Sequence, residues 1–183
     1  GAELAVYDIP DRVDEIYLGA DGLLYVCDTI GDVAAVYTQE GERLGSIDIS
    51  AARFDQYSLR LEQSGDGSIW LRTEQGGSGY VYHLDGTALT LGTEYALPQN
   101  TQTLYTGDAE HPFLYSTDAE LSWWSPSDGG TELILVWEEC GISGGDDMRS
   151  IIPDGDGFIC LYAGCLARIS PASPDEVKPK VVL

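Results

Sequence analysis

Few residues of this sequence have the types and the spacing that covalent catalysis requires. Gly141, Ser143 and Gly145 match the written form of a nucleophile elbow. That motif needs a strand, a turn and a helix around the serine, together with a histidine and an oxyanion hole, and no helical pattern follows it here. The two histidines, His83 and His111, have no evident serine or carboxylate partner. We therefore expect the protein not to be an enzyme.

Four aspartates near the C-terminus could hold a metal ion. They are Asp146, Asp147, Asp154 and Asp156. Carboxylate oxygens are ligands that Ca²⁺ prefers. The run from Asp154 to Gly157 lacks the downstream glutamate of an EF-hand loop, however, and is also typical of a hairpin turn. We expect no cofactor, with calcium at these four aspartates as the alternative.

Residues of irregular loops are the candidates for binding a ligand. Three such loops, residues 50–56, 98–102 and 140–147, join the repeats described below. Loops that a sheet scaffold holds in place commonly carry binding residues. Trp123 and Trp124 are neighbours in a predicted strand, so one should be buried while the other faces outward. The predicted ligand-binding residues are Arg53, Asp55, Gln56, Asn100, Gln102 and Trp124.

The charge of the chain limits its partners. Nine Lys and Arg face 31 Asp and Glu, giving a formal net charge of −22 and an isoelectric point near 4.1. A field of that sign repels phosphates, so we expect no nucleic-acid partner. It favours a cationic or neutral polar ligand, although solubility alone also explains it. No apolar run is long enough to span a membrane.

An internal repeat of about 45 residues shows which elements must position these loops. Each unit contributes one turn residue in register: Gly22, Gly67, Pro112 and Gly157. Each also contributes one apolar residue in register: Leu24, Ile69, Leu114 and Ile159. We expect this apolar set to be buried in equivalent places. Four units account for almost the whole chain.

Each unit contains four short extended runs separated by turns, some of them Asp-Gly pairs that favour tight hairpins. No stretch shows the apolar stripe of a helix. A meander of four strands buries both of its faces only when neighbouring meanders stack on it, as propeller blades do. The sequence therefore predicts an all-β, β-propeller-like fold over residues 1–170, with four repeats of four antiparallel strands. It is either four-bladed or part of a larger ring. A β-sandwich has the same strand density but no reason to repeat at this period.

The two ends of the chain compete for one strand position. Residues 4–9 have the pattern of a fourth strand and could complete the last unit, but residues 177–183 stand at the equivalent position of that unit. If both are strands, the chain is an open part of a larger ring. Residues 171–183 are thus a linker, a closing strand or the start of a following domain.

The cysteines leave two possibilities open for one hairpin. Cys160 and Cys165 flank a predicted turn, and a four-residue loop would place them opposite each other, close enough for a disulfide. A two-residue turn at Ala163-Gly164 would instead pair Cys160 with Ala167 and leave both thiols free.

The first two units carry the clearest shared pattern. The first reads Asp-Gly-Leu-Leu-Tyr-Val from Asp21, with Val36-Tyr37 and Gly41 following; the second repeats it from Asp66, with Val81-Tyr82 and Gly86. This pattern resembles the blades of NHL-type and related bacterial extracellular propellers. Residues 178–183 are similar to the first strand of bacterial extracellular solute-binding proteins. The resemblance implies the propeller part of a surface lipoprotein, with a fused solute-binding domain.

These features favour a non-catalytic, extracytoplasmic recognition module that binds a peptide, a glycan or a protein. One alternative is a hydrolase or lyase of propeller fold, and another is a structural spacer within a larger surface lipoprotein. Residues 2–8 lack the basic start and long apolar run of a signal peptide. An extracellular or cell-surface location therefore presumes that a signal peptide has been removed.

Overall fold

The computed structural model describes residues 9, 12–52, 59–108, 110–140, 148–155, 157–162, 165–170 and 180–182. Within these residues the fold is all-β, with a single short 3-10 helix, Trp137–Cys140. The strands form four four-stranded antiparallel sheets, each a meander in chain order. The predicted all-β, propeller-blade fold with four strands per repeat is confirmed. No helix in the described residues is long and apolar enough to cross a membrane.

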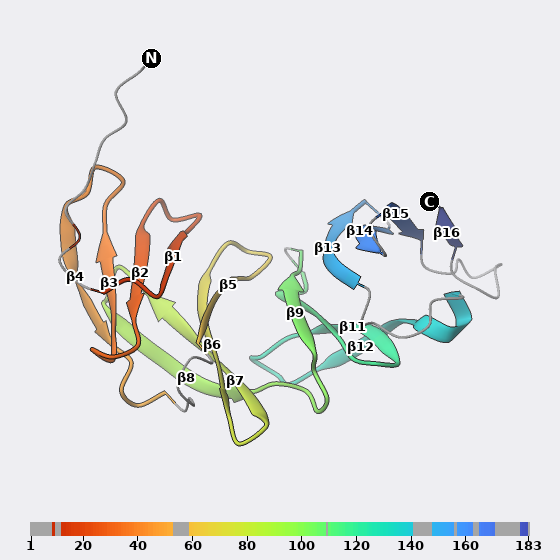
Figure 1. Ribbon diagram of the computed structural model, residues 1–183, viewed down its shortest axis with the longest axis horizontal. Helices are drawn as coiled ribbons and strands as arrows, with labels where there is room; N and C mark the ends of the chain where they lie inside the picture. The colour runs from red at the N-terminus through yellow and green to blue at the C-terminus, as the bar shows by residue number, and fades with distance from the viewer. Residues whose placement is uncertain are drawn as a thin grey trace, which may run out of the picture. The chain divides into compact units, whose positions relative to one another are not determined.

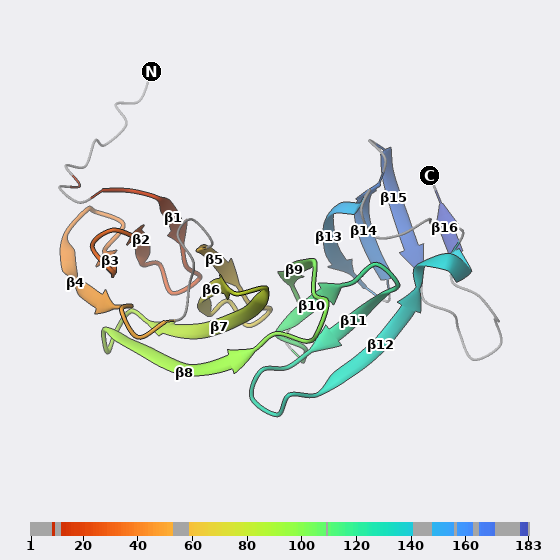
Figure 2. The same cartoon turned by 60° about the horizontal axis from the view of Figure 1, so that its bottom comes forward.

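The first compact unit of the chain comprises Gly1–Gln63 and Gly67–Glu94 and contains two blades. Blade 1 consists of β1 (Glu15–Leu18), β2 (Leu24–Asp28), β3 (Val33–Tyr37) and β4 (Arg43–Asp48). Blade 2 consists of β5 (Arg60–Gln63), β6 (Ile69–Gln75), β7 (Ser78–Asp85) and β8 (Thr90–Ala96). In Figures 1 and 2, β1 of blade 1 lies beside β5 of blade 2.

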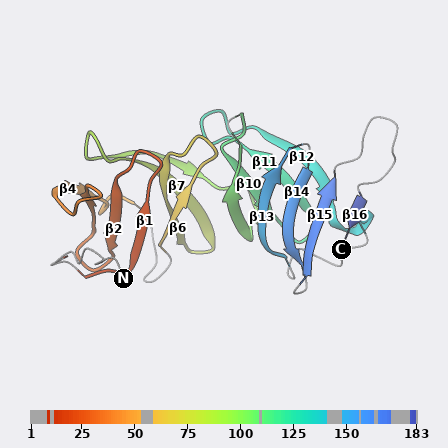
Figure 3. The same ribbon diagram turned by 90° about the horizontal axis from the view of Figure 1, so that it is seen from above.

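The second compact unit comprises Ser64–Asp66 and Tyr95–Leu183 and contains the other two blades. Blade 3 consists of β9 (Thr103–Thr106), β10 (Phe113–Ser116), β11 (Glu120–Trp124) and β12 (Thr131–Val136). Blade 4 consists of β13 (Met148–Asp154), β14 (Gly157–Tyr162), β15 (Cys165–Ser170) and β16 (Lys180–Val182), which run side by side in Figure 3.

Glycines at the predicted turns have the backbone conformation that tight hairpins need. Gly22 and Gly67 have φ of 79° and 87°, a left-handed region in which other residues are strained. Gly76 and Gly77 both have positive φ, at 60° and 81°, in the two-residue turn between β6 and β7. Such a turn matches the twist of its flanking strands, and these two strands form seven paired positions.

The core of the first unit lies between its two sheets. Blade 1 contributes Tyr25, Cys27 and Val36 from one face, and blade 2 contributes Ile69 and Leu71 from the face turned towards it. All five side chains are buried. We call these the forward face of blade 1 and the backward face of blade 2. Their apolar contact holds the two sheets together because each sheet alone would leave this surface in water.

The second unit repeats this arrangement with a shift of one residue. Its core joins Leu114, on the forward face of blade 3, to Phe158 and Cys160, on the backward face of blade 4. Phe158 rather than Ile159 is therefore the counterpart of Ile69. The strict repeat fails by one residue between blades 2 and 3, and a slip of one residue moves every side chain of a strand to the opposite face.

This shift corrects the prediction for the apolar set. Ile69 and Leu114 are buried, but on opposite faces, so their places are not equivalent. Leu24 and Ile159 are only half-buried, because they lie on the backward face of blade 1 and the forward face of blade 4, outside the two cores. The prediction that all four residues are buried in equivalent places is wrong.

Two open alternatives about the last blade are resolved. The C-terminal segment supplies its fourth strand, since β16 pairs with β15; residues 4–8 lie outside the described residues. The turn between β14 and β15 has two residues, so Cys160 pairs with Ala167 and its thiol is free. Cys160 Sγ lies 3.5 Å from the Ala167 carbonyl oxygen. The disulfide between Cys160 and Cys165 is therefore not formed.

Candidate functional site

Two predicted ligand-binding residues line one pocket at an end of blade 3. Asn100 and Gln102, from the loop between β8 and β9, face Asp118 and its neighbours in the loop between β10 and β11. The pocket has a volume of about 410 Å³. Its complete lining is Asn100, Thr101, Gln102, Thr117, Asp118 and Ala119. We call it the Asn100 pocket.

Hydrogen bonds fix the first of the two loops. Asn100 has a positive φ of 61°, a conformation that asparagine tolerates better than most residues. The Thr101 hydroxyl donates to the Pro98 carbonyl oxygen at 2.7 Å. The Gln102 amide N–H donates to the Ser116 carbonyl oxygen at 2.8 Å, and its side-chain amide donates to Asp118. Hydrogen bonds within the chain thus hold this side of the Asn100 pocket in shape.

The second loop is fixed at Thr117. Its hydroxyl oxygen accepts hydrogen bonds from the amides of Ala119 and Glu120, at 3.1 Å and 3.2 Å. Its carbonyl oxygen accepts one from the indole N–H of Trp137 at 3.0 Å. Trp137 is fully buried, so this contact ties the loop to the core. The lining offers hydroxyl, amide and carboxylate groups for hydrogen bonding, and it contains no cysteine, histidine or lysine for covalent chemistry.

A second hollow lies at the opposite end of the blade 3 strands. It consists of two adjoining pockets, of about 250 Å³ and about 390 Å³, which share His111, Trp123 and Glu132. The smaller one extends towards Glu110 and Asp128. The larger one extends towards Asp108 and Ile134 and towards four residues of blade 4, namely Pro153, Gly155, Gly157 and Phe158. We call the two together the His111 groove. No residue of this groove was a predicted ligand-binding residue except Trp124.

His111 has a carboxylate partner, so the expectation that it lacks one is wrong. Its Nδ1 lies 3.2 Å from Asp108 Oδ1, and its backbone N–H donates to the same oxygen at 2.7 Å. Burial tends to raise the pKa of Asp108, but the hydrogen bonds from the amides of His111 and Glu110 outweigh it and lower that pKa. Asp108 is therefore a charged residue that orients the imidazole.

The two neighbouring tryptophans lie on opposite faces of the sheet and one of them is buried, as predicted, but the other packs against the core of the second unit instead of facing outward. Trp124 is buried, with 3% of its surface exposed, and stacks on Phe113 at a centroid distance of 5.8 Å. Trp123 is half-buried and lies against the His111 ring. The tryptophan that we selected as a ligand-binding residue is thus the buried one, while its neighbour presents more surface to the groove.

A charged network in the first unit was not predicted. Burial raises the pKa of Glu62 on β5 to about 7, and the negative charge of Glu15 on β1 adds to this, although Arg72 and Arg60 oppose it. Arg72 Nη1 lies 3.8 Å from Glu62 Oε1, and Nη2 lies 3.1 Å from Glu74 Oε1. Glu15 accepts a hydrogen bond from the Leu61 amide. Burial and the nearby charge of Glu15 distinguish Glu62 from other glutamates, and the sequence shows neither.

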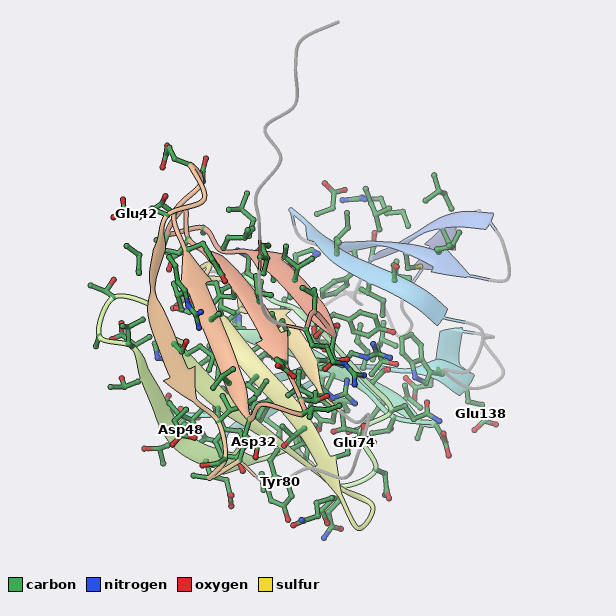
Figure 4. The ribbon with its side chains drawn as sticks, turned by 60° about the vertical axis from the view of Figure 1, so that its left-hand side comes forward. Asp32, Glu42, Asp48, Glu74, Tyr80 and Glu138 are labelled. Atoms are coloured by element: carbon green, nitrogen blue, oxygen red, sulfur yellow. The ribbon has the colours of Figure 1, made fainter. Side chains whose placement is uncertain are left out.

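Acidic side chains of the first unit are spread widely. Figure 4 shows Asp32 and Asp48 at one end of blade 1 and Glu42 at the other. Asp32 and Asp48 are close because β3 starts where β4 ends, with the Ile49 amide donating to the Asp32 carbonyl oxygen at 2.9 Å. A charge distributed over both ends of a sheet agrees with a role in solubility.

The remaining predicted site residues lie mostly outside the described residues. These are Arg53, Asp55, Gln56, Asp146, Asp147 and Asp156, together with the motif at Ser143. Asp154 is described, and its carboxylate pairs with Arg168 at 3.2 Å. Within the described ranges no three His, Cys, Asp or Glu side chains are grouped closely enough to hold a metal ion.

Comparisons with known proteins identify no family. No protein-family model matches the chain, and a search of curated proteins finds no match. Among solved structures, the crystal structure of Porphyromonas gingivalis dipeptidyl peptidase 4 is similar, with 14% sequence identity and a TM-score of 0.41. The match covers 97% of this chain and 31% of the peptidase chain. The chain therefore spans about a third of the length of that protein, and a likeness of this size carries no argument about activity.

Proposed function

We propose that this chain is a non-catalytic recognition module that binds a neutral polar ligand, a glycan or a peptide main chain, in the Asn100 pocket. One observation carries the proposal. Two residues that the sequence predicts to bind a ligand, Asn100 and Gln102, line a single pocket whose loops are fixed by hydrogen bonds within the chain. A preformed pocket loses less conformational entropy when a ligand binds.

The chemistry of the lining favours binding over catalysis. Amide and hydroxyl groups both donate and accept hydrogen bonds, which suits the hydroxyls of a sugar or the amides of a peptide. A catalytic site of hydrolase type would need an activated nucleophile or an acid–base pair. Asp118 is the single ionisable residue among the lining residues, and it accepts a hydrogen bond from Gln102.

The wider setting that we propose is extracytoplasmic, as part of a larger surface protein. Support comes from the blade pattern of the first two units, which resembles bacterial extracellular propellers, and from the net charge of −22, which keeps an exposed protein soluble. A protease-protection assay on cells that produce the full-length protein would test the location. Protection in intact cells, with digestion after lysis, would contradict it.

A hydrolase or lyase is the second candidate function, and one observation favours it. The pKa of Glu62 is raised to about 7, which is suitable for a general acid or base near neutral pH. Glu62 and Glu15 lie on β5 and β1, which are in contact. Turnover of a glycan or peptide by the pure protein that disappears in Glu62→Gln would favour this function over binding.

A ligand screen tests the recognition proposal. Thermal-shift measurements with panels of neutral glycans and peptides should identify ligands, and calorimetry should give their affinities. Asn100→Gly keeps the positive φ but removes the side-chain amide, so it should weaken binding about fivefold to tenfold. Gln75→Ala, at an exposed position of the β6–β7 hairpin, is the matched control and should bind normally. Equal binding by Asn100→Gly and the native protein would contradict the proposal.

A further inference from the structure

We propose that the His111 groove is a second binding site, for the cationic side chain of a lysine or arginine in a peptide or protein. This site is separate from the Asn100 pocket and does not depend on it. Three features carry the proposal: the shape and apolar wall of the groove, the carboxylates around it, and an aromatic stack that excludes other ligands.

The groove has the size and the wall for an extended alkyl chain. Its larger part, about 390 Å³, is lined by Trp123, Ile134, Pro153 and Phe158. Phe158 is buried, and its ring centroid lies 5.5 Å from that of Trp123. Lysine and arginine pack their methylene stems on such apolar surfaces and keep the charged head at a polar rim.

The polar rim of the groove is anionic. Glu110, Asp128 and Glu132 line the smaller part, and no lysine or arginine of the described residues lies within ion-pair distance of them. The Glu132 carboxylate is 74% exposed and lies 3.8 Å from His111 Nε2, beyond hydrogen-bonding distance. A cationic head at this rim would therefore meet three carboxylates that form no ion pair with a described lysine or arginine.

His111 neutralises only part of the rim. Its Nδ1 contacts Asp108, and its ring lies flat against Trp123, with centroids 4.7 Å apart and an interplanar angle of 17°. The imidazole is the only group among the lining residues that can carry a positive charge. Its charge, when present, is shared between Asp108 at 3.2 Å and Glu132 at 3.8 Å, so Glu110 and Asp128 form no ion pair with a described residue.

The same stack argues against other ligands. One face of the Trp123 indole is covered by His111, so that face cannot stack on a sugar ring. Anions would be repelled by the carboxylates. A metal ion needs several ligands at close range, and the described residues contain no group of three His, Cys, Asp or Glu that could provide them.

Backbone hydrogen bonds hold the groove in place. The Asp108 amide donates to the His111 carbonyl oxygen at 2.8 Å, closing the loop between β9 and β10. The Gly65 amide, in the turn Ser64–Asp66 of the same unit, donates to the Pro112 carbonyl oxygen at 2.8 Å. A Cβ at Gly65 would lie 1.9 Å from the Asp108 carbonyl oxygen, so the turn approaches this closely only with glycine.

Short capped peptides that differ at one residue test the proposal. The central residue is lysine, arginine, norleucine or citrulline, and binding to the native chain is followed by calorimetry and by tryptophan fluorescence. We expect the lysine and arginine peptides to bind, and norleucine and citrulline to bind at least about fivefold more weakly. Free cadaverine, a diamine, tests whether the alkyl ammonium suffices without a peptide backbone; weaker binding than the lysine peptide would assign the ligand to peptides.

Two groove variants and one control locate the binding. Glu132→Gln and Asp128→Asn each remove one negative charge while keeping the side-chain shape, and each should weaken lysine-peptide binding about threefold to tenfold. Glu42→Gln removes the same charge at an exposed position of blade 1 and should have no effect. Thermal unfolding of all three variants checks that they fold.

Three outcomes would overturn the proposal. Norleucine binding as well as lysine would show that the groove recognises alkyl chains without charge. An equal loss in Glu42→Gln would show general attraction to an acidic protein rather than a site. No measurable binding of any cationic peptide at low salt would show that the groove has no such ligand.

Discussion

The ring of His111 stacks on the indole of Trp123 with centroids 4.7 Å apart, and the same imidazole contacts Asp108 at 3.2 Å. Three residues from one loop and one strand thus form a fixed side of the His111 groove. Because Asp108 also accepts two backbone hydrogen bonds, this side of the groove depends on that single carboxylate.

Asp108→Ala should destabilise the protein by about 1–2 kcal/mol, since it leaves the amides of Glu110 and His111 without their acceptor. Folding lowers the pKa of Asp108. The charged carboxylate therefore stabilises the folded protein above the ordinary carboxyl pKa, and this stabilisation is lost as pH falls through the pKa that Asp108 has in the folded protein. Urea unfolding of both proteins should therefore differ at neutral pH and converge in acid. A constant difference at all pH values would contradict this account.

Glu62→Gln should stabilise the protein at alkaline pH. Burial raises the folded pKa of Glu62 to about 7, above the ordinary carboxyl value of 4.5. As pH rises, Glu62 therefore loses its proton at a lower pH in the unfolded chain than in the folded protein. The free energy of unfolding falls as pH rises from 4.5 to about 7. Glutamine carries no charge, so the variant should be as stable as the native protein in acid and more stable above neutral pH. Glu94→Gln, whose native carboxylate accepts a hydrogen bond from Tyr82, should show no such gain.

Alanine substitutions test the one-residue shift between the blades. Phe158→Ala should cost about 3–5 kcal/mol, because Phe158 lies in the core between blades 3 and 4. Ile159→Ala should cost no more than about 1–2 kcal/mol, because this side chain is half-buried on the opposite face. Chemical unfolding measures both. The reverse order would restore the strict repeat and contradict the register.

Cysteine labelling tests the thiol environments. Cys27 is fully buried, and burial raises the pKa of its thiol to about 12. Burial also raises the pKa of Cys160. Iodoacetamide reacts with thiolates, so neither residue should be labelled in the folded protein at neutral pH, and both should be labelled after unfolding. Mass spectrometry of the peptides gives the result. Rapid native labelling of Cys27 would contradict the burial of the core.

Much of the fold could be predicted from the sequence because short-range signals specify it. The blades and most strand positions were predicted from three signals: the turn glycines, the recurring apolar residues and the absence of a helical pattern. The register of the second unit could not be predicted. The connection between β5 and β6 in blade 2 spans residues 64–68, whereas that between β9 and β10 in blade 3 spans residues 107–112 and is one residue longer. Alignment at a fixed period conceals such differences in turn length.

The candidate sites, like the fold, could be predicted from the sequence only in part. Asn100 and Gln102 could be selected because they lie in an irregular loop, but their common pocket depends on a second loop at Asp118. The contact between Asp108 and His111 could have been predicted from the sequence, since the two residues are three positions apart in a predicted turn. The raised pKa of Glu62 could not have been predicted, because it arises from burial and from Glu15, a residue distant in sequence.

The proposal that the Asn100 pocket binds a neutral polar ligand without altering it can be tested by backbone NMR of the protein, titrated with a glycan or peptide from the screen. We expect the amide signals of Thr101, Gln102, Asp118 and Ala119 to shift in a saturable manner and the ligand spectrum to stay chemically unchanged. Shifts confined to other parts of the chain, or conversion of the ligand to a product, would contradict the claim.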